Sequence, residues 1–122
     1  GIYRLADLNN LSIEHKRRYF FRGKGINSHQ VKIKPEISGD IHYQYLNLIS
    51  PKWDLPGSFD AIFCRNVLIY FDQQTQQQIL NRFSRLLKPN GLLFVGHSEH
   101  FSHQGSPFIL HGQSVYKLTQ ER

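Results

Sequence analysis

The clearest hydrophobic pattern lies in the second half of the chain. Residues 59–64 are almost continuously apolar, which is typical of a strand in a parallel sheet with helices over both faces. A second apolar run at residues 92–96 predicts another buried strand. Between them, after a cap at Asp72 or Thr75, apolar side chains recur at the spacing of one helix face: Ile79, Leu80, Phe83, Leu86 and Leu87.

The segment Lys88-Pro89-Asn90-Gly91 predicts a sharp end to that helix. Proline cannot extend a helix, and Asn90 and Gly91 accept positive φ. Strand, helix and strand in this order form a βαβ unit with parallel strands and a right-handed crossover. Residues 108–110 and 114–118 predict a closing hairpin.

The first half of the chain has shorter patterns. Residues 12–22 predict a short helix that Ser12 caps and that ends at the glycines after it. Residues 31–34 alternate apolar and basic side chains, and they predict a half-exposed strand that Pro35 ends. Residues 41–46 alternate again and predict a further strand.

The predicted topology indicates where a ligand would bind. In open sheets of parallel strands, ligands lie beyond the carboxyl ends of the strands. Three polar clusters follow predicted strands and would share that edge: Asn47 and Leu48, then Arg65, Asn66 and Val67, then His97, Ser98 and Glu99.

Two interpretations of the Arg65-Asn66 cluster are open from the residues alone. A buried strand that ends in these residues must give both side chains partners, because an unpaired buried polar group costs about 1–3 kcal/mol. In the first interpretation they fix a loop, with Asn66 bonded to backbone and Arg65 paired with an acid such as Glu99. In the second, Asn66 contacts a bound ligand and Tyr70 points its hydroxyl into the site.

Other candidate chemistry is weaker. His97, His100 and His103 flank Glu99, but they follow a strand end without a second carboxylate nearby, so no metal site is predicted. Instead, we expect His97 to pack or hydrogen-bond where the strand ends. Cys64 lies within a predicted strand and is expected to be a buried, inert thiol. No catalytic serine elbow, Walker motif or Gly-x-Gly-x-x-Gly fingerprint appears in the sequence.

Composition narrows the class of protein. The chain has 122 residues, 39% of them apolar, which is enough for one domain with a core. Its single cysteine excludes a disulfide framework and a multi-thiolate zinc site. No apolar run approaches the ~18–20 residues of a membrane span, so a cytoplasmic protein is the default expectation. The chain begins at Gly1 and contains no methionine, which indicates an incomplete sequence.

The charge of the chain is local. The net charge is +6, and residues 14–34 hold seven lysines and arginines against one acid, Glu14. This excess favours an acidic partner such as nucleic acid, anionic lipid, an acidic protein surface or a polyanionic substrate. The basic and aromatic run at residues 16–24 is compatible with nucleic-acid binding, but a helix with an aromatic core face and a solvated basic face is the favoured interpretation.

Several of these runs resemble one family. Residues 59–72 read Phe-Asp-Ala-Ile-Phe-Cys-Arg-Asn-Val-Leu-Ile-Tyr-Phe-Asp, and Gly-His-Ser-Glu follows at residues 96–99. Together these runs are similar to the signature of the chemotaxis protein methyltransferases, the CheR family. Residues 18–23, 46–48 and 86–94 match in the same order and spacing, so the resemblance covers nearly the whole chain.

The resemblance implies an α/β fold. It would be a partial Rossmann-like S-adenosylmethionine-dependent methyltransferase fold, formed by the C-terminal strands and helix. Residues 1–122 would be the C-terminal part of the catalytic domain, and residues 19–38 would be a small inserted antiparallel β-subdomain. The glycine-rich cofactor loop and the ribose-binding acid of the family would lie before Gly1, so we expect the chain alone to be poorly stable and to bind cofactor poorly.

The implied activity is methylation of glutamate side chains on the cytoplasmic domain of bacterial chemoreceptors. The cofactor would be S-adenosyl-L-methionine. By resemblance, Asn47 and Leu48 would contact its adenosine end, Arg65 and Asn66 would lie along it, and Tyr70 would position the attacking carboxylate. No metal, nucleic acid or membrane insertion is implied.

The β-subdomain implies a second contact with the receptor. In some members it binds a C-terminal receptor peptide, and Arg22, Gly23 and Lys32 are the corresponding candidates here. The chain departs from peptide-binding members at His29, where they favour glycine, and at Lys32 and Lys34, where arginines are common. Two alternatives to the whole assignment are a Rossmann-like methyltransferase of another substrate and a basic docking module.

Overall fold

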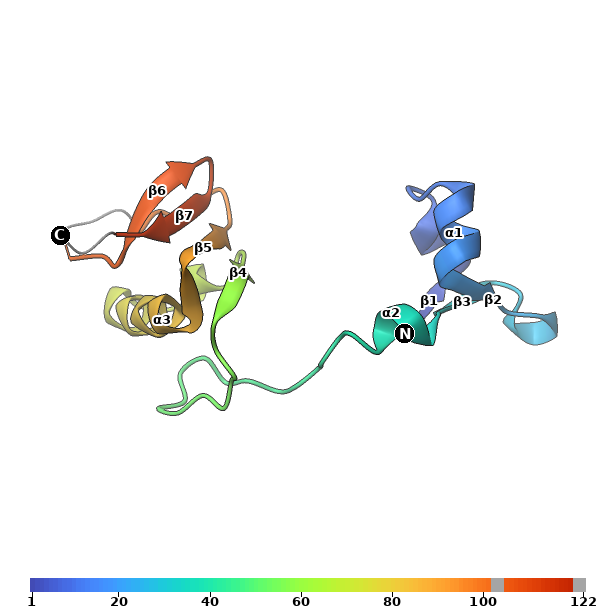
Figure 1. Cartoon of the computed structure of the whole chain (residues 1–122), viewed down its shortest axis with the longest axis horizontal. Coiled ribbons are helices and arrows are strands. Elements are labelled where there is room, and N and C mark those ends of the chain that lie inside the picture. The colour runs from blue at the N-terminus through green and yellow to red at the C-terminus, as the bar shows by residue number, and fades with distance from the viewer. Residues whose placement is uncertain (102–104, 120–122) are drawn as a thin grey trace. The chain divides into compact units, whose positions relative to one another are not determined.

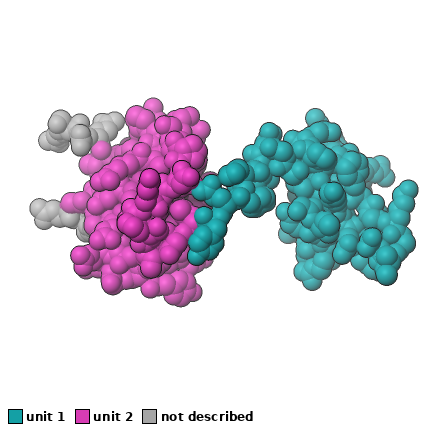
Figure 2. Space-filling model, turned by 90° about the horizontal axis from the view of Figure 1, so that it is seen from below, with its two compact units in different colours: residues 1–45 teal, residues 46–122 magenta. Residues whose placement is uncertain are grey.

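The computed structural model describes residues 1–101 and 105–119. The chain divides into two compact units, Gly1–Tyr45 and Leu46–Arg122, which Figure 2 shows in different colours. Each unit has a sheet of its own (Figure 1). All candidate cofactor residues belong to the second unit, and all candidate peptide residues belong to the first.

The first unit is built on a three-stranded antiparallel sheet. Its strands are β1 (Ile2–Arg4), β2 (Phe20–Arg22) and β3 (Gln30–Ile33), in the order β1-β3-β2. Val31 at the centre of β3 pairs with both Tyr3 and Arg22 and is buried. The strand predicted at residues 31–34 is therefore confirmed, one residue earlier than expected.

The predicted helix at residues 12–22 is shorter in the structure. Helix α1 covers Ile13–Tyr19, and the Ser12 hydroxyl caps it by accepting from the His15 N–H at 3.2 Å. Residues 20–22 form β2 instead, because their backbone groups pair with β3 and cannot also continue the helix. No residue of α1 is buried. Short turns at Leu5–Leu8 and Gly25–Asn27 and the helix α2 (Pro35–Ser38) complete the unit.

The prediction of a strand at residues 41–46 is wrong. This segment has no strand pairing in the described part of the chain. Its aromatic side chains point to solvent, with Tyr43 and Tyr45 79% and 90% exposed. Alternation predicts a strand only where a neighbouring strand supplies the hydrogen-bond partners, and none does so here.

The second unit confirms the predicted strand, helix, strand and hairpin. Its elements are β4 (Phe59–Cys64), α3 (Gln73–Leu86), β5 (Leu87–Val95), β6 (Phe108–Gly112) and β7 (Val115–Leu118). The sheet order is β4-β5-β7-β6, with β4 and β5 parallel and the other pairs antiparallel. Asp72 caps α3 by accepting from the Thr75 N–H at 2.7 Å, which lowers the pKa of the Asp72 carboxyl.

The Lys88–Gly91 segment ends the helix as predicted, but not through positive φ. Positive φ among the described residues occurs elsewhere, so Asn90 and Gly91 do not use it. The segment is an irregular start of β5, where the pairing moves from Phe59–Leu87 to Ala61–Leu92. A Cβ on Gly91 would lie 3.1 Å from the Phe59 carbonyl oxygen. Glycine is needed here for space.

The core of the second unit lies between α3 and one face of the sheet. Helix residues Ile79, Leu80 and Phe83 pack with sheet residues that include Leu93 and Tyr116, all nearly inaccessible. The expectation that both faces of β4 are covered is wrong for the described residues. Its Phe63 is 70% exposed and stacks on Phe94 at a centroid distance of 4.3 Å.

Candidate functional site

Arg65 and Asn66 lie at the carboxyl end of β4, beside the end of β5. The two strands are in parallel register there, with Cys64 opposite Val95, so the segments that follow β4 and β5 leave the sheet at the same edge. Asn66 has φ 58°, a left-handed conformation that costs energy for any residue other than glycine. Both side chains are exposed. The predicted sheet edge is therefore present for the cluster after β4, which holds Arg65 and Asn66, and for the cluster after β5, which holds Glu99.

The Glu99 carboxylate joins the two strand ends. Glu99 is only 3% exposed, and its Oε1 accepts from the backbone N–H of Asn66 at 2.7 Å and of Gly96 at 2.9 Å. Its Oε2 is buried and has no hydrogen-bond partner among the described residues. We call this arrangement of Glu99 with the Asn66 and Gly96 amides the Glu99 clamp.

The Glu99 clamp corrects one sequence-based expectation. Arg65 does not pair with Glu99, because one carboxylate oxygen is occupied by backbone N–H groups and the other has no partner in the described structure. The loop is fixed through backbone, as the first interpretation expected, but Asn66 donates through its main-chain N–H. Arg65 makes no ion pair with the described residues, so its guanidinium is available.

Gly96 makes room for Asn66. A Cβ at Gly96 would lie 2.2 Å from Asn66 Oδ1 and 2.8 Å from Glu99 Oε1, both far inside van der Waals contact. Only glycine at this position therefore allows the Asn66 side chain to lie where it does. The sequence signal for this contact is the Gly-His-Ser-Glu run, but sequence reasoning alone did not connect it with Asn66.

Cys64 is buried beneath this turn, as predicted. Burial, with a further contribution from the Glu99 charge, raises the pKa of its thiol from 9.0 to about 11. A thiol with this pKa is protonated at neutral pH and is a poor nucleophile. The structure thus gives Cys64 a packing role.

Asn47 and Leu48 form a turn that α3 holds in place. The Asn47 side-chain oxygen accepts from the Ile49 N–H at 3.2 Å, and Leu48 packs against the core. No strand precedes this turn, contrary to the prediction. Its position comes instead from Arg82, which donates to the carbonyl oxygens of Leu48, at 3.3 Å, and of Ser50.

Sequence reasoning missed Arg82. The guanidinium also lies over the Trp53 ring, 5.2 Å from its centroid. Its sequence signal is an arginine directly before Phe83, beside the apolar stripe of α3, where a charged side chain needs a specific partner. The partner carbonyls lie in an irregular loop more than thirty residues away, which no spacing pattern identifies.

Tyr70 lies in a 3-10 turn, Leu68–Tyr70, just after Asn66. Leu68 is completely buried and anchors the turn, whereas Tyr70 is 80% exposed. The Gln76 amide donates to the carbonyl oxygens of Leu68 at 2.8 Å and Phe71 at 3.1 Å. Gln76, in the first turn of α3, thus fixes the turn that carries Tyr70.

The histidines after β5 do not gather into a metal site in the described structure. His97 Nδ1 lies 3.3 Å from the Ser114 hydroxyl, which confirms the expected hydrogen bond at the strand end. His103 lies outside the described residues. Within residues 1–101 and 105–119 no three side chains of the metal-binding types come together.

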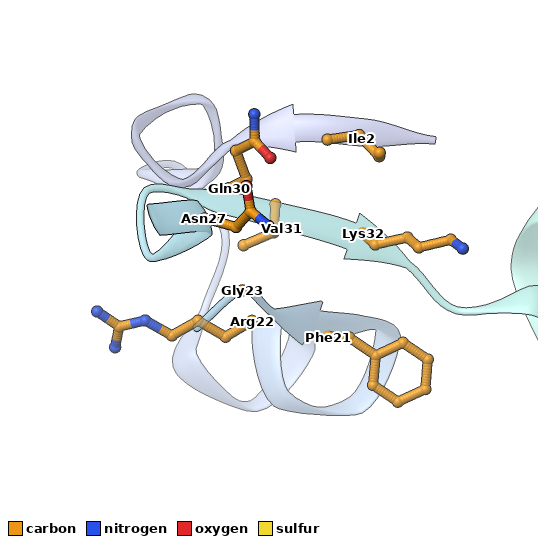
Figure 3. Close-up of a pocket in the computed structure, with 8 residues that line it drawn as sticks. All are labelled: Ile2, Phe21, Arg22, Gly23, Asn27, Gln30, Val31 and Lys32. Atoms are coloured by element: carbon orange, nitrogen blue, oxygen red, sulfur yellow. The ribbon is translucent and has the colours of Figure 1, made fainter. Parts of the chain in front are cut away.

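The three candidate peptide-binding residues line one cavity of the first unit (Figure 3). Its volume is about 190 Å³. Figure 3 shows Arg22 at one end and Lys32 at the other, with Gly23 and Val31 between them. The other lining residues come from the same small sheet and its turn: Ile2, Phe21, Asn27 and Gln30.

The second unit defines a class of protein. A parallel β4-α3-β5 arrangement with polar turns at the carboxyl edge is characteristic of Rossmann-like α/β proteins that bind a ligand at that edge. The family comparison makes this specific. Residues 1–117 match the CheR methyltransferase, SAM binding domain, and the chain belongs to this family.

Curated relatives agree over nearly the whole chain. A chemotaxis protein methyltransferase of Klebsiella aerogenes is 53% identical over 122 residues, and one of Escherichia coli K12 is 52% identical over 121. Chemotaxis protein methyltransferase 2 of Pseudomonas aeruginosa is 41% identical over 116 residues. The matches cover 100%, 99% and 95% of this chain, but only 42%, 42% and 41% of the relatives.

The helices offer no sign of a membrane span. Among the described residues, none is both long enough and apolar enough to cross a bilayer.

Proposed function

We propose that this chain forms the C-terminal part of the catalytic domain of a protein-glutamate O-methyltransferase. In this proposal it acts in the cytoplasm and uses S-adenosyl-L-methionine to methylate glutamate side chains of bacterial chemoreceptors. Residues 19–38 are the proposed β-subdomain, whose sheet also includes β1. The observation that carries the proposal is the Glu99 clamp, since it holds Asn66 at the sheet edge where parallel strands bind ligands, in a chain that matches the SAM binding domain.

Four exposed or half-buried residues of the second unit fit such a cofactor chemically. Leu48 is half-buried and offers an apolar surface for a flat ring, and Asn47 stands beside it with a side chain already fixed by the turn. Arg65 and Asn66 are exposed, and Asn66 is held through its main-chain N–H, which leaves its side-chain amide for a ligand. We propose that Asn47, Leu48, Arg65 and Asn66 bind the cofactor.

The proposed reaction needs little acid–base catalysis by the protein. The cofactor supplies a methyl group on a sulfonium, so the bond from carbon to sulfur breaks as the bond to the glutamate oxygen forms. The nucleophile is already a carboxylate, so no strong general base is needed. Tyr70, exposed and fixed by Leu68 and Gln76, is proposed to orient that carboxylate, and catalysis comes from proximity and electrostatics.

The test uses a chimaera in which these 122 residues replace the matching segment of the Klebsiella aerogenes relative. Methyl transfer from labelled cofactor to receptor-bearing vesicles is the assay. We expect Tyr70→Phe to lower kcat about tenfold and Asn66→Ala to raise KM for the cofactor about tenfold. Tyr43→Phe, at an exposed tyrosine of the other unit, is the matched control and should change neither constant.

Two results would refute this assignment. The first is a chimaera without methyl transfer where the relative itself is active. The second is methyl transfer to an acceptor other than receptor glutamates, which would support a Rossmann-like methyltransferase of another substrate. A salt-sensitive shift of RNA that persists without cofactor would support the basic docking module.

We further propose that the first-unit cavity binds a C-terminal receptor peptide. Arg22 and Lys32 at its two ends favour an acidic sequence, and β2 is an edge strand of its sheet that can pair with an extended peptide. A pull-down with receptor C-terminal peptide against a scrambled control tests this. Arg22→Ala should weaken capture, whereas Arg85→Ala, an exposed arginine of the second unit, should not. Equal capture of both peptides would exclude the proposal.

A further inference from the structure

A buried carboxylate is costly unless its oxygens are compensated. Glu99 is 3% exposed, and neither described salt bridge involves it. Its compensation comes from two main-chain N–H groups on Oε1, while Oε2 has no partner in the described structure. A hydrogen bond to a charged acceptor is about twice as strong as a neutral one, so these two contacts constrain the backbone strongly.

The two amides belong to different strand ends. The Asn66 amide follows β4 and the Gly96 amide follows β5, so a single oxygen ties the two ends together. The tie also acts on a residue in an unfavourable backbone conformation, because Asn66 has φ 58°. Asparagine adopts this conformation more readily than other non-glycine residues, and the hydrogen bond from its N–H to Glu99 stabilises it further.

We propose that Glu99 is a positioning residue of the cofactor site, which holds Asn66 in its left-handed conformation and so directs the Asn66 side chain across Gly96. This inference rests on the proposed function. Glu99 itself needs no contact with cofactor or substrate. It acts through Asn66, since both of its hydrogen bonds are to the main chain and the Asn66 side chain lies 2.2 Å from where a Cβ on Gly96 would be.

The variants at Glu99 separate positioning from charge. Glu99→Ala removes the shared acceptor and leaves the Asn66 and Gly96 amides without it. Glu99→Gln keeps an oxygen at the Oε1 position and places an amide group where Oε2 has no partner. If Glu99 acts by positioning Asn66 through Oε1, Glu99→Gln should therefore retain the wild-type KM for the cofactor. Glu36→Ala, at an exposed glutamate of the first unit, is the matched control.

In the chimaera, we expect Glu99→Ala to raise KM for S-adenosylmethionine about tenfold with kcat within about threefold of wild type. Glu99→Gln should stay within about threefold of wild type in both constants. Gly96→Ala should raise KM in the same way as Glu99→Ala although it keeps the glutamate, because its Cβ would overlap both the Asn66 side chain and the Glu99 carboxylate and so break the Glu99 clamp. If Glu99→Ala fails to fold, Gly96→Ala still tests whether the Glu99 clamp supports cofactor binding.

Results that contradict the role of Glu99 can be distinguished from results that contradict the proposed function. An unchanged KM in both Glu99→Ala and Gly96→Ala overturns the inference while the wild-type chimaera is active. A loss of thermal stability in Glu99→Ala with KM unchanged also overturns it, since the role is then structural only. A wild-type chimaera that neither binds nor uses the cofactor overturns the proposed function and, with it, this inference.

Discussion

At the scale of single residues, Cys64 has the most altered acid–base behaviour. The folded pKa of about 11 lies above the ordinary 9.0, so the thiol form is favoured by folding. The stability that this preference contributes is complete below pH 9 and is lost as the pH rises through 11. We expect the free energy of unfolding, measured in urea, to fall over this window by less in Cys64→Ala than in wild type.

A second measurement checks the same shift directly. At a given pH between neutral and 9, the folded chain should carry about a hundredfold less thiolate than the unfolded chain. Alkylation of Cys64 by iodoacetamide should accordingly be slow in the native protein and fast in denaturant. Equal native and denatured rates would contradict both the burial and the raised pKa.

The candidate site was only partly predictable from individual residues. Asn66 and Glu99 were both singled out because they follow strands that the apolar runs identify. Glu99 was expected to pair with Arg65, and its contact with Asn66 was missed, because the donor is a main-chain N–H, which every residue type carries. Arg82 was missed for the complementary reason, since its partners are carbonyl oxygens of an irregular loop.

At the scale of elements, α3 does more than cover the sheet. Its apolar face packs on the core, and Arg82 on the same helix fixes the turn that carries Leu48. Trp53, the single tryptophan of the chain, lies under the Arg82 guanidinium and packs against Phe83. The helix therefore couples the core to one of the candidate cofactor turns.

We expect Arg82→Ala to destabilise the second unit by about 1–3 kcal/mol, because two carbonyl groups lose a charged donor. Trp53 emission should change in the same variant, since the cation over its ring is removed. Lys117→Ala, at an exposed lysine of the same unit, is the control for both readouts. An unchanged emission spectrum in Arg82→Ala would show that the guanidinium does not contact the ring in solution.

A helix or strand could be predicted where its own sequence pattern identifies the surface against which it packs. The apolar run of β4 and the helical spacing of α3 describe surfaces that meet each other, and both were predicted correctly. The segment at residues 41–46 alternates as well as any strand, but its pairing depends on a neighbour that the local sequence does not specify. Residues 20–22 became β2 for the converse reason, because β3 supplies them with partners.

At the scale of the whole molecule, β4 is an edge strand of the four-stranded sheet. Its outer face carries Phe63, 70% exposed and stacked on Phe94. An edge with unpaired backbone groups and an exposed phenylalanine favours association with further polypeptide. Arg65 and Asn66 follow β4 directly, so the described site has one wall formed by β4, α3 and their turns.

The last prediction concerns the 122-residue chain by itself. A site with one wall gives a cofactor few of the contacts that enclosed pockets provide, and such pockets cover about 70–90% of a bound ligand. We expect calorimetric titration with S-adenosylmethionine to show no saturation at concentrations that saturate the chimaera. The chimaera is the positive control, because it contains the same 122 residues. Binding by the isolated chain as tight as by the chimaera would mean that β4, α3 and their turns form the complete site.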